Sequence, residues 1–137
     1  MSDIHDACVG LAQAVSTIPG LEGVPYLSDN INPPTAHVFN RQYDPRFTLG
    51  GSPNRLVALG LRVYIRRTPP EEAQRRMRDY MEQSGTYSII EAVEDEGRWD
   101  EQVHYAEVTQ IGQPFEVAID GGNTVFLAVD FDVDVVL

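Results

Sequence analysis

The chain has 137 residues and a mass of 15.3 kDa, the size of a single domain. Hydrophobic residues make up 42% and charged residues 23%, a balance typical of a globular domain and unlike that of a disordered chain. No apolar run approaches the roughly 20 residues that a membrane helix needs, and we expect no secretory signal at the N-terminus. The single cysteine, Cys8, excludes an internal disulfide and a multi-cysteine zinc site.

Charge is unevenly distributed along the chain. The formal net charge is −11, and all ten basic residues are arginine. Residues 1–90 carry nine acids and nine arginines, whereas residues 91–137 carry 12 acids and only Arg98. A nucleic-acid-binding protein needs a concentrated basic surface, and so does a protein that binds anionic membranes. We therefore expect neither function; the acidic excess also favours solubility.

The N-terminal part is expected to begin with a helix over residues 3–18. Apolar residues recur there at helical spacing, and Pro19-Gly20 ends the pattern. Cys8 lies on this apolar stripe, so we interpret it as a core residue and not as a reactive thiol.

A stretch rich in proline and glycine follows, with one predicted strand from Ala36 to Asn40. Residues 41–54 mix arginine, aromatic and glycine residues. We expect this segment to be an extended loop or hairpin that orders against a partner.

The middle of the chain predicts a strand and two helices. Leu56 to Arg67 alternates strictly between apolar and other residues, which is typical of a strand with one buried face. Thr68-Pro69-Pro70-Glu71 has the pattern of a capping box that starts a helix reaching about Ser84, with Gly85 as its stop. Ser88 to Glu91 has the same pattern and predicts a short helix to about Glu94.

The C-terminal region, residues 102–137, is predicted to be all β. Gln102 to Thr109 and Pro114 to Ile119 are predicted strands, and a turn at residues 120–123 joins the second to a long last strand from Thr124 to Leu137. The element order predicts a single α+β domain, with helices on one face of a mainly antiparallel or mixed sheet.

Motifs for catalysis or cofactor binding are not found in the sequence, including the phosphate-binding loop, the nucleophile elbow and the zinc-binding helix motif. The three histidines, His5, His37 and His104, have no paired spacing, so we interpret each as a surface or hydrogen-bonded residue. We therefore expect no catalytic residue, no metal and no cofactor.

Three aspartates near the C-terminus, Asp130, Asp132 and Asp134, resemble the start of a calcium loop. Val135 stands where that loop needs glycine, and the chain ends before its last ligand. In a strand, the three carboxylates share one face at a spacing of roughly 7 Å. Such a face must be well solvated, paired with arginines or occupied by cations; it is either an exposed strand face or a deliberately negative surface such as a channel wall.

A second acidic cluster, Glu94-Asp95-Glu96, precedes Asp100-Glu101. Clustered carboxylates can bind magnesium or transfer protons, but no apolar pocket is predicted around these. We interpret this segment as a solvated acidic loop.

The order of the predicted elements and short motifs along the chain resembles that of the tail terminator proteins of long-tailed, siphovirus-like bacteriophages, especially those that infect actinobacteria. The resemblance covers nearly the whole chain and rests on these short segments: Ile18-Pro19-Gly20-Leu21, Leu61-Arg62-Val63, Arg78-Asp79-Tyr80-Met81, the corner Ser84 to Ile89, Glu91 to Asp95, and the closing strand Phe126 to Val136. The sequence departs from the family at Gly97-Arg98-Trp99, where a leucine and paired glycines are expected.

The resemblance implies a structural virion protein without catalysis. Such terminators form a hexameric ring at the head-proximal end of the tail tube, stop tube polymerisation and provide the surface that joins the head; their fold resembles that of tail-tube proteins. The implied partners are further copies of the chain, the tail-tube protein and a head-completion or neck protein. DNA passes through the ring without specific binding, no membrane is involved, and assembly takes place in the host cytoplasm.

The charge distribution suggests which residues make these contacts. A closed ring needs two different, complementary faces on each subunit. We expect subunit or tube contacts from these residues: Arg41, Arg46, Phe47, Arg55, Arg62, Arg66, Arg75, Arg76 and Arg78. We expect an acidic interface or lumen surface from these: Glu94, Asp95, Glu96, Asp130, Asp132 and Asp134.

Two alternatives remain open at this stage. A head-completion or neck protein is also a ring-forming virion component, and it would bind portal-bearing heads instead of tail tubes. A small monomeric acidic hydrolase or ligand-binding module is the more distant alternative, and it predicts one deep pocket with perturbed titratable groups.

Overall fold

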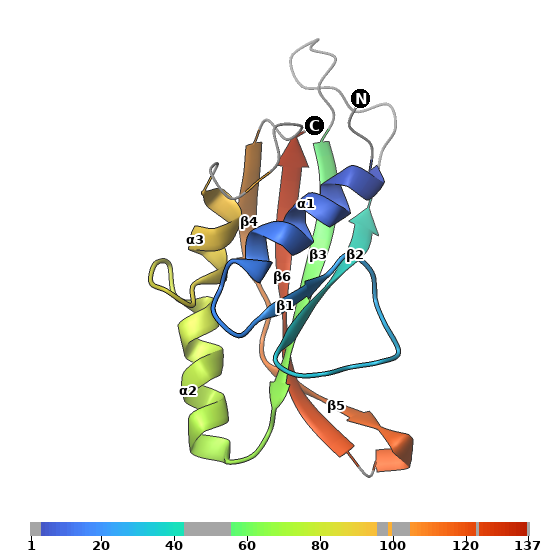
Figure 1. The fold of residues 1–137 in the computed structure, drawn as a ribbon, viewed down its shortest axis with the longest axis vertical. Helices are drawn as coiled ribbons and strands as arrows, with labels where there is room; N and C mark the ends of the chain where they lie inside the picture. Colours follow the sequence, from blue (N-terminus) through green and yellow to red (C-terminus); the bar gives the residue numbers. More distant parts are fainter. Residues whose placement is uncertain (1–3, 43–55, 96–98, 100–104, 123, 137) are drawn as a thin grey trace.

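A mixed, six-stranded sheet forms the framework of the molecule (Figure 1). The computed structural model describes residues 4–42, 56–95, 99, 105–122 and 124–136. The strands are β1 (Glu22–Val24), β2 (Thr35–Gln42), β3 (Leu56–Arg66), β4 (Tyr105–Ile111), β5 (Phe115–Ile119) and β6 (Thr124–Val136). Their order is β1-β2-β3-β6-β4, with β5 also paired to β6. Among the strands of the described residues, only the β1–β2 pair is parallel.

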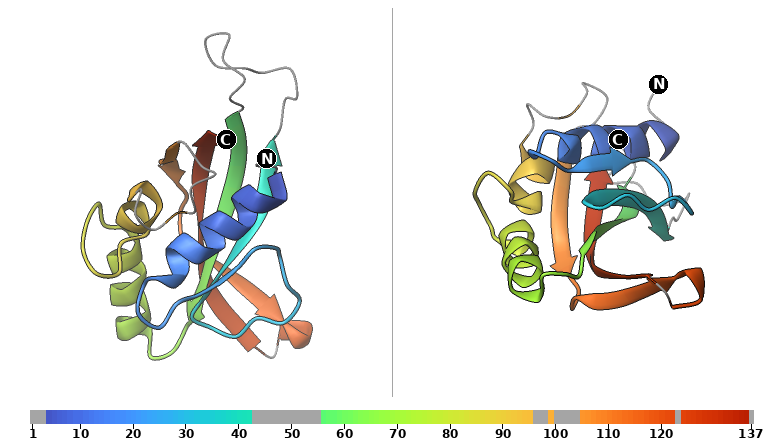
Figure 2. Two further views of the ribbon diagram at one scale, coloured as in Figure 1. Left: turned by 45° about the horizontal axis from the view of Figure 1, so that its top comes forward. Right: turned by 60° about the horizontal axis from the view of Figure 1, so that its bottom comes forward.

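Strand β6 organises the sheet because it is paired along both edges. One edge pairs with β3 from Leu56↔Val136 to Arg66↔Phe126. The other edge pairs with β4 and then with β5. Between these two strands, the Gly112 N–H donates to the Asp130 carbonyl at 2.8 Å and continues the pairing. Figure 2 shows the β5–β6 hairpin turning away from the rest of the sheet.

Three helices pack on one face of the sheet: α1 (Ile4–Ser16), α2 (Pro70–Met81) and α3 (Ile89–Glu94). One cluster of buried residues joins all three helices to the same face of β3 and β6. The core face predicted for β3 is confirmed, because Val57, Leu59, Leu61, Val63 and Ile65 are all buried. The strand does not have only one buried face, since Gly60 and Tyr64 on the other face are buried as well. The α+β fold with helices on one face of the sheet is therefore confirmed. The three helices do not cover the opposite face of the sheet.

The first prediction that fails is the start of α2. Pro69 and not Thr68 is the N-cap residue, it has no side-chain cap, and the helix begins at Pro70. The physical reason is that a residue before proline is excluded from helical geometry, so Pro70 holds Pro69 extended at φ −71° and ψ 143°.

The predicted end of α2 is also wrong. The helix ends at Met81, three residues before Ser84, because Glu82 adopts an extended conformation and its carbonyl accepts a hydrogen bond from the Ser88 hydroxyl at 2.6 Å. Gly85 therefore does not stop α2, although it does adopt a positive φ of 124°.

One of the two hydrogen bonds of the capping box predicted for α3 is confirmed. The Ser88 hydroxyl accepts a hydrogen bond from the Glu91 N–H at 3.1 Å. The Glu91 carboxylate does not return to Ser88, as a capping box would require, but accepts from the Gly85 N–H at 3.2 Å. This hydrogen bond fixes the corner that precedes α3.

The C-terminal β region agrees with the prediction wherever it is described. Strand β4 covers the second half of the predicted Gln102–Thr109 strand and extends to Ile111, while residues 100–104 lie outside the described part of the chain. The predicted hairpin is confirmed because Ile119 pairs with Thr124. Gly121 supplies the positive φ of 66° that the turn requires.

The strand β1 was not predicted, because it is short and lies in the stretch rich in proline and glycine. It is held against α1, where the Gly23 N–H donates to the Ser16 hydroxyl at 2.9 Å. A Cβ at Gly23 would lie 2.1 Å from the Ala12 carbonyl oxygen, so only glycine fits this approach.

Candidate functional site: the charged face of the sheet

The face of the sheet opposite the helices carries a group of arginines and aspartates. The strand register places His37, Arg62 and Asp130 in one row across β2, β3 and β6. Every second residue of a strand points to the same face, so Asp132 and Asp134 lie on the same face as Asp130. The predicted common face of the three aspartates is therefore confirmed.

The pair Arg62–Asp130 forms the centre of this face. The Arg62 Nε lies 2.8 Å from Asp130 Oδ1, and Nη2 lies 3.0 Å from Oδ2. The Arg62 guanidinium also lies between two aromatic rings, 5.3 Å from the centroid of Phe39 and 5.2 Å from that of Phe115. The hydrogen bond to Asp130 raises the pKa of Arg62, and burial opposes this effect more weakly. The charge is thus held rigidly in place.

The side chain of Arg41 pairs with the other two aspartates. Its Nη2 lies 2.7 Å from Asp134 Oδ1 and its Nη1 lies 3.5 Å from Asp132 Oδ2. Its Nε donates to the Leu59 carbonyl at 2.6 Å, so the side chain crosses over β3 to reach β6.

A β-bulge makes this reach feasible. Asn40 pairs with Leu59 and Gln42 pairs with Ala58, which leaves Arg41 as the extra residue on β2. A bulge bends a strand and redirects a side chain. Arg41 therefore belongs to the end of β2 and not to a loop, contrary to the prediction for residues 41–54; residues 43–54 lie outside the described part of the chain.

Pairing with arginine is thus how the chain accommodates its row of aspartates. Two guanidinium groups form ion pairs with three carboxylates, and the aspartate side chains remain 28–30% exposed. Glu107 on β4 pairs directly with Asp134 on β6 and extends the negative row. Across the described residues, no group of three or more histidine, cysteine, aspartate or glutamate side chains could hold a metal ion.

Of the other predicted arginines, Arg66, Arg75, Arg76 and Arg78 form a separate group on and beside α2. Arg75 and Arg78 are exposed on the outer side of α2, and Arg66 is exposed at the end of β3. Arg76 stacks on Tyr87, with its guanidinium carbon 3.8 Å from the ring centroid. Arg46, Phe47 and Arg55 lie outside the described residues. The structure therefore separates the predicted set into a sheet-face group and an α2 group.

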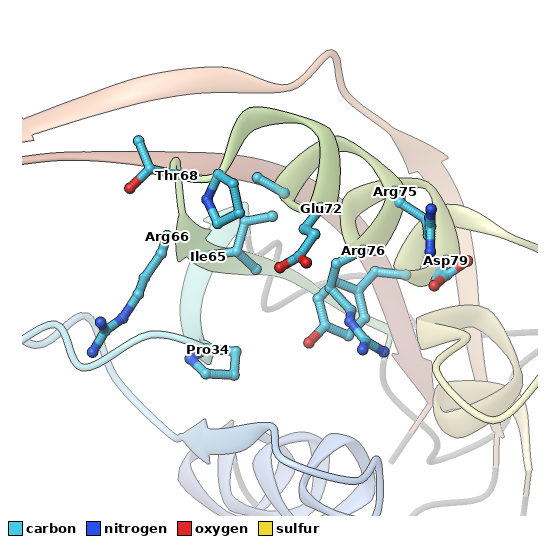
Figure 3. A pocket seen from close by; sticks show the side chains of 11 residues that line it. Pro34, Ile65, Arg66, Thr68, Glu72, Arg75, Arg76 and Asp79 are labelled. Carbon is cyan, nitrogen blue, oxygen red and sulfur yellow. The ribbon is translucent and has the colours of Figure 1, made fainter.

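A cavity of about 550 Å³ lies between α2 and the end of β3 (Figure 3). Arg66 reaches it from β3, while Glu72 and Arg76 reach it from α2. The Nη1 atom of Arg76 is buried without a hydrogen-bond partner. A hydrogen bond to Tyr87 raises the pKa of Arg76, and burial raises the pKa of Tyr80 in the cavity wall.

One residue of the acidic segment at the end of α3, Glu94, has a structural role. The Glu94 carboxylate accepts a hydrogen bond from the Val108 N–H at 3.2 Å and so caps the outer edge of β4. Asp95 is exposed at the end of α3, and Glu96 lies outside the described residues. Strand β4 lies between Glu94 and the aspartates of β6.

Some residues of this region were not predicted from the sequence. Phe39 and Phe115 enclose Arg62, and their role depends on a strand register that no local pattern reveals. His37 is buried, and its Nδ1 accepts a hydrogen bond from the Ser28 N–H at 3.3 Å, in agreement with the prediction of a hydrogen-bonded histidine. Burial lowers the pKa of His37, so its neutral form is favoured.

Comparisons of the sequence with models of protein families and with curated proteins find no match. No helix within the described residues is both long and apolar enough to span a membrane.

Proposed function

We propose that this protein is a tail terminator of a long-tailed bacteriophage: a ring that caps the head-proximal end of the tail tube, ends its growth and provides the surface to which the head joins. The observation that carries the proposal is the two-sided character of the sheet. Helices and a continuous apolar core cover one face, while the other presents the row of Arg41, Arg62 and the three aspartates. This is the arrangement that a ring subunit needs when one side of its sheet faces a passage.

The charges of the sheet face suit a passage for DNA. The three aspartates and Glu107 outnumber the two arginines that lie among them. A net negative wall repels phosphate groups, so DNA slides past without binding. The arginine pairs hold the carboxylates in place and limit repulsion among them.

The α2 group of arginines suits a contact between subunits. Arg75 and Arg78 are exposed on α2, whereas 12 of the 21 acids lie in residues 91–137. Arginines of one copy can therefore meet acids of the next copy in a head-to-tail arrangement, which closes into a ring. Arg62 is less suited to this contact because Asp130 of its own chain already occupies its guanidinium.

Two measurements test the proposal. Light scattering and electron microscopy of the purified protein should show a ring with six copies, free or at the ends of tail tubes. The protein should bind purified tail tubes and should not bind portal-bearing heads that lack tails. Binding to such heads alone would instead favour a head-completion protein, and a monomer that never caps tubes would overturn the proposal.

A further inference from the structure

His37 on β2 is buried against the loop of residues 25–34, which joins β1 to β2 (Figure 1). Only 1% of the residue is exposed. Its Nδ1 accepts a hydrogen bond from the Ser28 N–H at 3.3 Å, so Nε2 carries the proton of the neutral ring. That Nε2 is buried and has no hydrogen-bond partner among the described residues. The neutral ring is therefore held to the loop by a single hydrogen bond that it accepts.

This hydrogen bond links the loop to the sheet. Within the described part of the chain, no other hydrogen bond joins residues 25–33 to the remaining elements. Ile31 packs against the small apolar cluster that includes Tyr64. A cavity of about 360 Å³ lies between the end of the loop, the end of β3 and the start of β6, so packing there is incomplete. The loop is thus attached at few points, and it can open while the sheet stays folded.

The charged groups around the ring do not favour a second proton. Arg62 lies directly opposite His37 on β3 and already carries a positive charge. Asp130, the next residue in this row, pairs with Arg62. Glu22 on β1 attracts a proton to the ring, but burial has the larger effect and lowers the pKa of His37. Further titratable groups on the adjoining elements are Tyr64 on β3, edge-on to the ring at a centroid distance of 5.0 Å, and the exposed Tyr26 and Asp29 on the loop.

A second proton on the ring would disrupt this arrangement in two ways. It would place an N–H on Nδ1 opposite the Ser28 N–H, where two donors face each other without an acceptor. It would also leave a buried positive charge beside Arg62, which is costly unless water reaches it. Opening the loop removes both costs, because water then has access to both ring nitrogens.

We propose that protonation of His37 releases the loop of residues 25–34 from the sheet while the rest of the fold stays intact. The loop is closed when the ring is neutral and open when the ring is charged, so His37 acts as a pH-sensitive switch. The open form exposes Tyr64, against which Ile31 packs in the closed form. This inference goes beyond the proposed function and does not depend on it.

Hydrogen exchange measured by NMR tests this switch. The protection factor of the Ser28 amide should fall by up to about tenfold for each pH unit below about 6.5, because the open form takes up one proton more readily than the closed form. The amide of Leu61 in β3 should stay at least roughly tenfold better protected at every pH, because local opening leaves the core folded. A Ser28 protection factor that does not change with pH, or that equals that of Leu61 throughout, would overturn the inference.

Two variants assign the switch to one histidine. His37→Gln offers a side-chain oxygen as acceptor for the Ser28 N–H and does not titrate, so the protection of Ser28 should become independent of pH. His5→Gln replaces an exposed histidine on α1 and should retain the pH dependence of the wild type. The same pH dependence in His37→Gln as in the wild type would overturn the inference.

The wild-type protein provides a readout that does not depend on whether His37→Gln folds. The amide signals of residues 26–31 should change with the same midpoint as the His37 imidazole, because one event moves both. The signals of α1, on the other face of the sheet, should not follow that midpoint. Loop signals that stay constant, or that change with a different midpoint, would overturn the inference.

Discussion

Arg62 on β3 and Asp130 on β6 lie directly opposite each other and join through two hydrogen bonds of 2.8 and 3.0 Å. This ion pair forms a fixed, polar surface in the middle of the sheet face that lies opposite the helices. Phe39 and Phe115 on either side of the guanidinium limit its movement further.

The pair should contribute measurably to stability. In a double-mutant cycle with Arg62→Ala and Asp130→Ala, we expect a coupling energy of about 1–2 kcal/mol, since both side chains are roughly one-third exposed and solvent screens them in part. Urea unfolding gives the free energies. The control is Arg67–Glu116, a more exposed pair at 3.5 Å, which should couple by less than about 0.5 kcal/mol. Equal coupling in the two cycles would contradict the central role of Arg62.

Gly60 should resist substitution for a purely steric reason. A Cβ at this position would lie 2.2 Å from the Phe39 ring, which covers the glycine across the β2–β3 pair. We expect Gly60→Ala to reduce the free energy of unfolding by about 1–3 kcal/mol.

Two further variants check this cause. Combining Gly60→Ala with Phe39→Ala should make the alanine at position 60 nearly neutral, because the colliding ring is gone. Gly112→Ala is a matched control, since its Cβ would lie at an ordinary 3.5 Å from the Asp130 carbonyl. A similar loss from Gly60→Ala with and without the Phe39 ring would rule out the steric explanation.

His37 should make stability depend on pH. Burial holds the pKa of the folded histidine below its ordinary value of about 6.5. The unfolded state therefore takes up a proton first as pH falls below about 6.5, and stability decreases until the folded form also protonates. Protonation of Nδ1 removes the acceptor for the Ser28 N–H.

Unfolding in urea between pH 8 and pH 5 measures this dependence. The wild type should lose stability in that range, and His37→Gln should remove the part that comes from this residue. An imidazole that titrates by NMR at its ordinary pKa would be incompatible with the buried, neutral His37.

The arginines of α2 should affect assembly and leave the fold intact. We expect Arg75→Glu with Arg78→Glu, both exposed on α2, to weaken ring formation, most strongly at low salt, because the reversed charges would repel the acids of the next copy. Light scattering over a range of salt concentrations measures the mass. Gln13→Glu adds an acid on α1 as a control and should have no effect. An unchanged mass at every salt concentration would argue against a contact through α2.

Local patterns predicted most of the elements, but not their mutual pairing. The alternation of β3, the cap at Ser88 and the turn before β6 are encoded in neighbouring residues, so the sequence reveals them directly. Arg62 and Asp130 are 68 positions apart, and Arg41 and Asp134 are 93 positions apart. Their pairing depends on strand register and on the bulge at Arg41, which no local pattern reveals.

The start of α2 was predicted wrongly although its local sequence pattern is clear. Thr68 and Glu71 have the right spacing for a capping box, yet the second proline of Pro69-Pro70 moves the N-cap by one residue. Similarly, β1 has only three residues and depends on the close approach of Gly23 to α1. A local steric effect of Pro70 decides the first feature, and a tertiary contact decides the second.

Tail-tube length tests the central claim most directly. Electron microscopy should compare tails assembled with and without this protein in the phage where we propose that it acts. With the protein, we expect tubes of uniform length that each end in a ring at the head-proximal end; without it, we expect tubes of widely varying and excessive length. Tubes of the same length in both cases, with no ring at their ends, would contradict the proposed function.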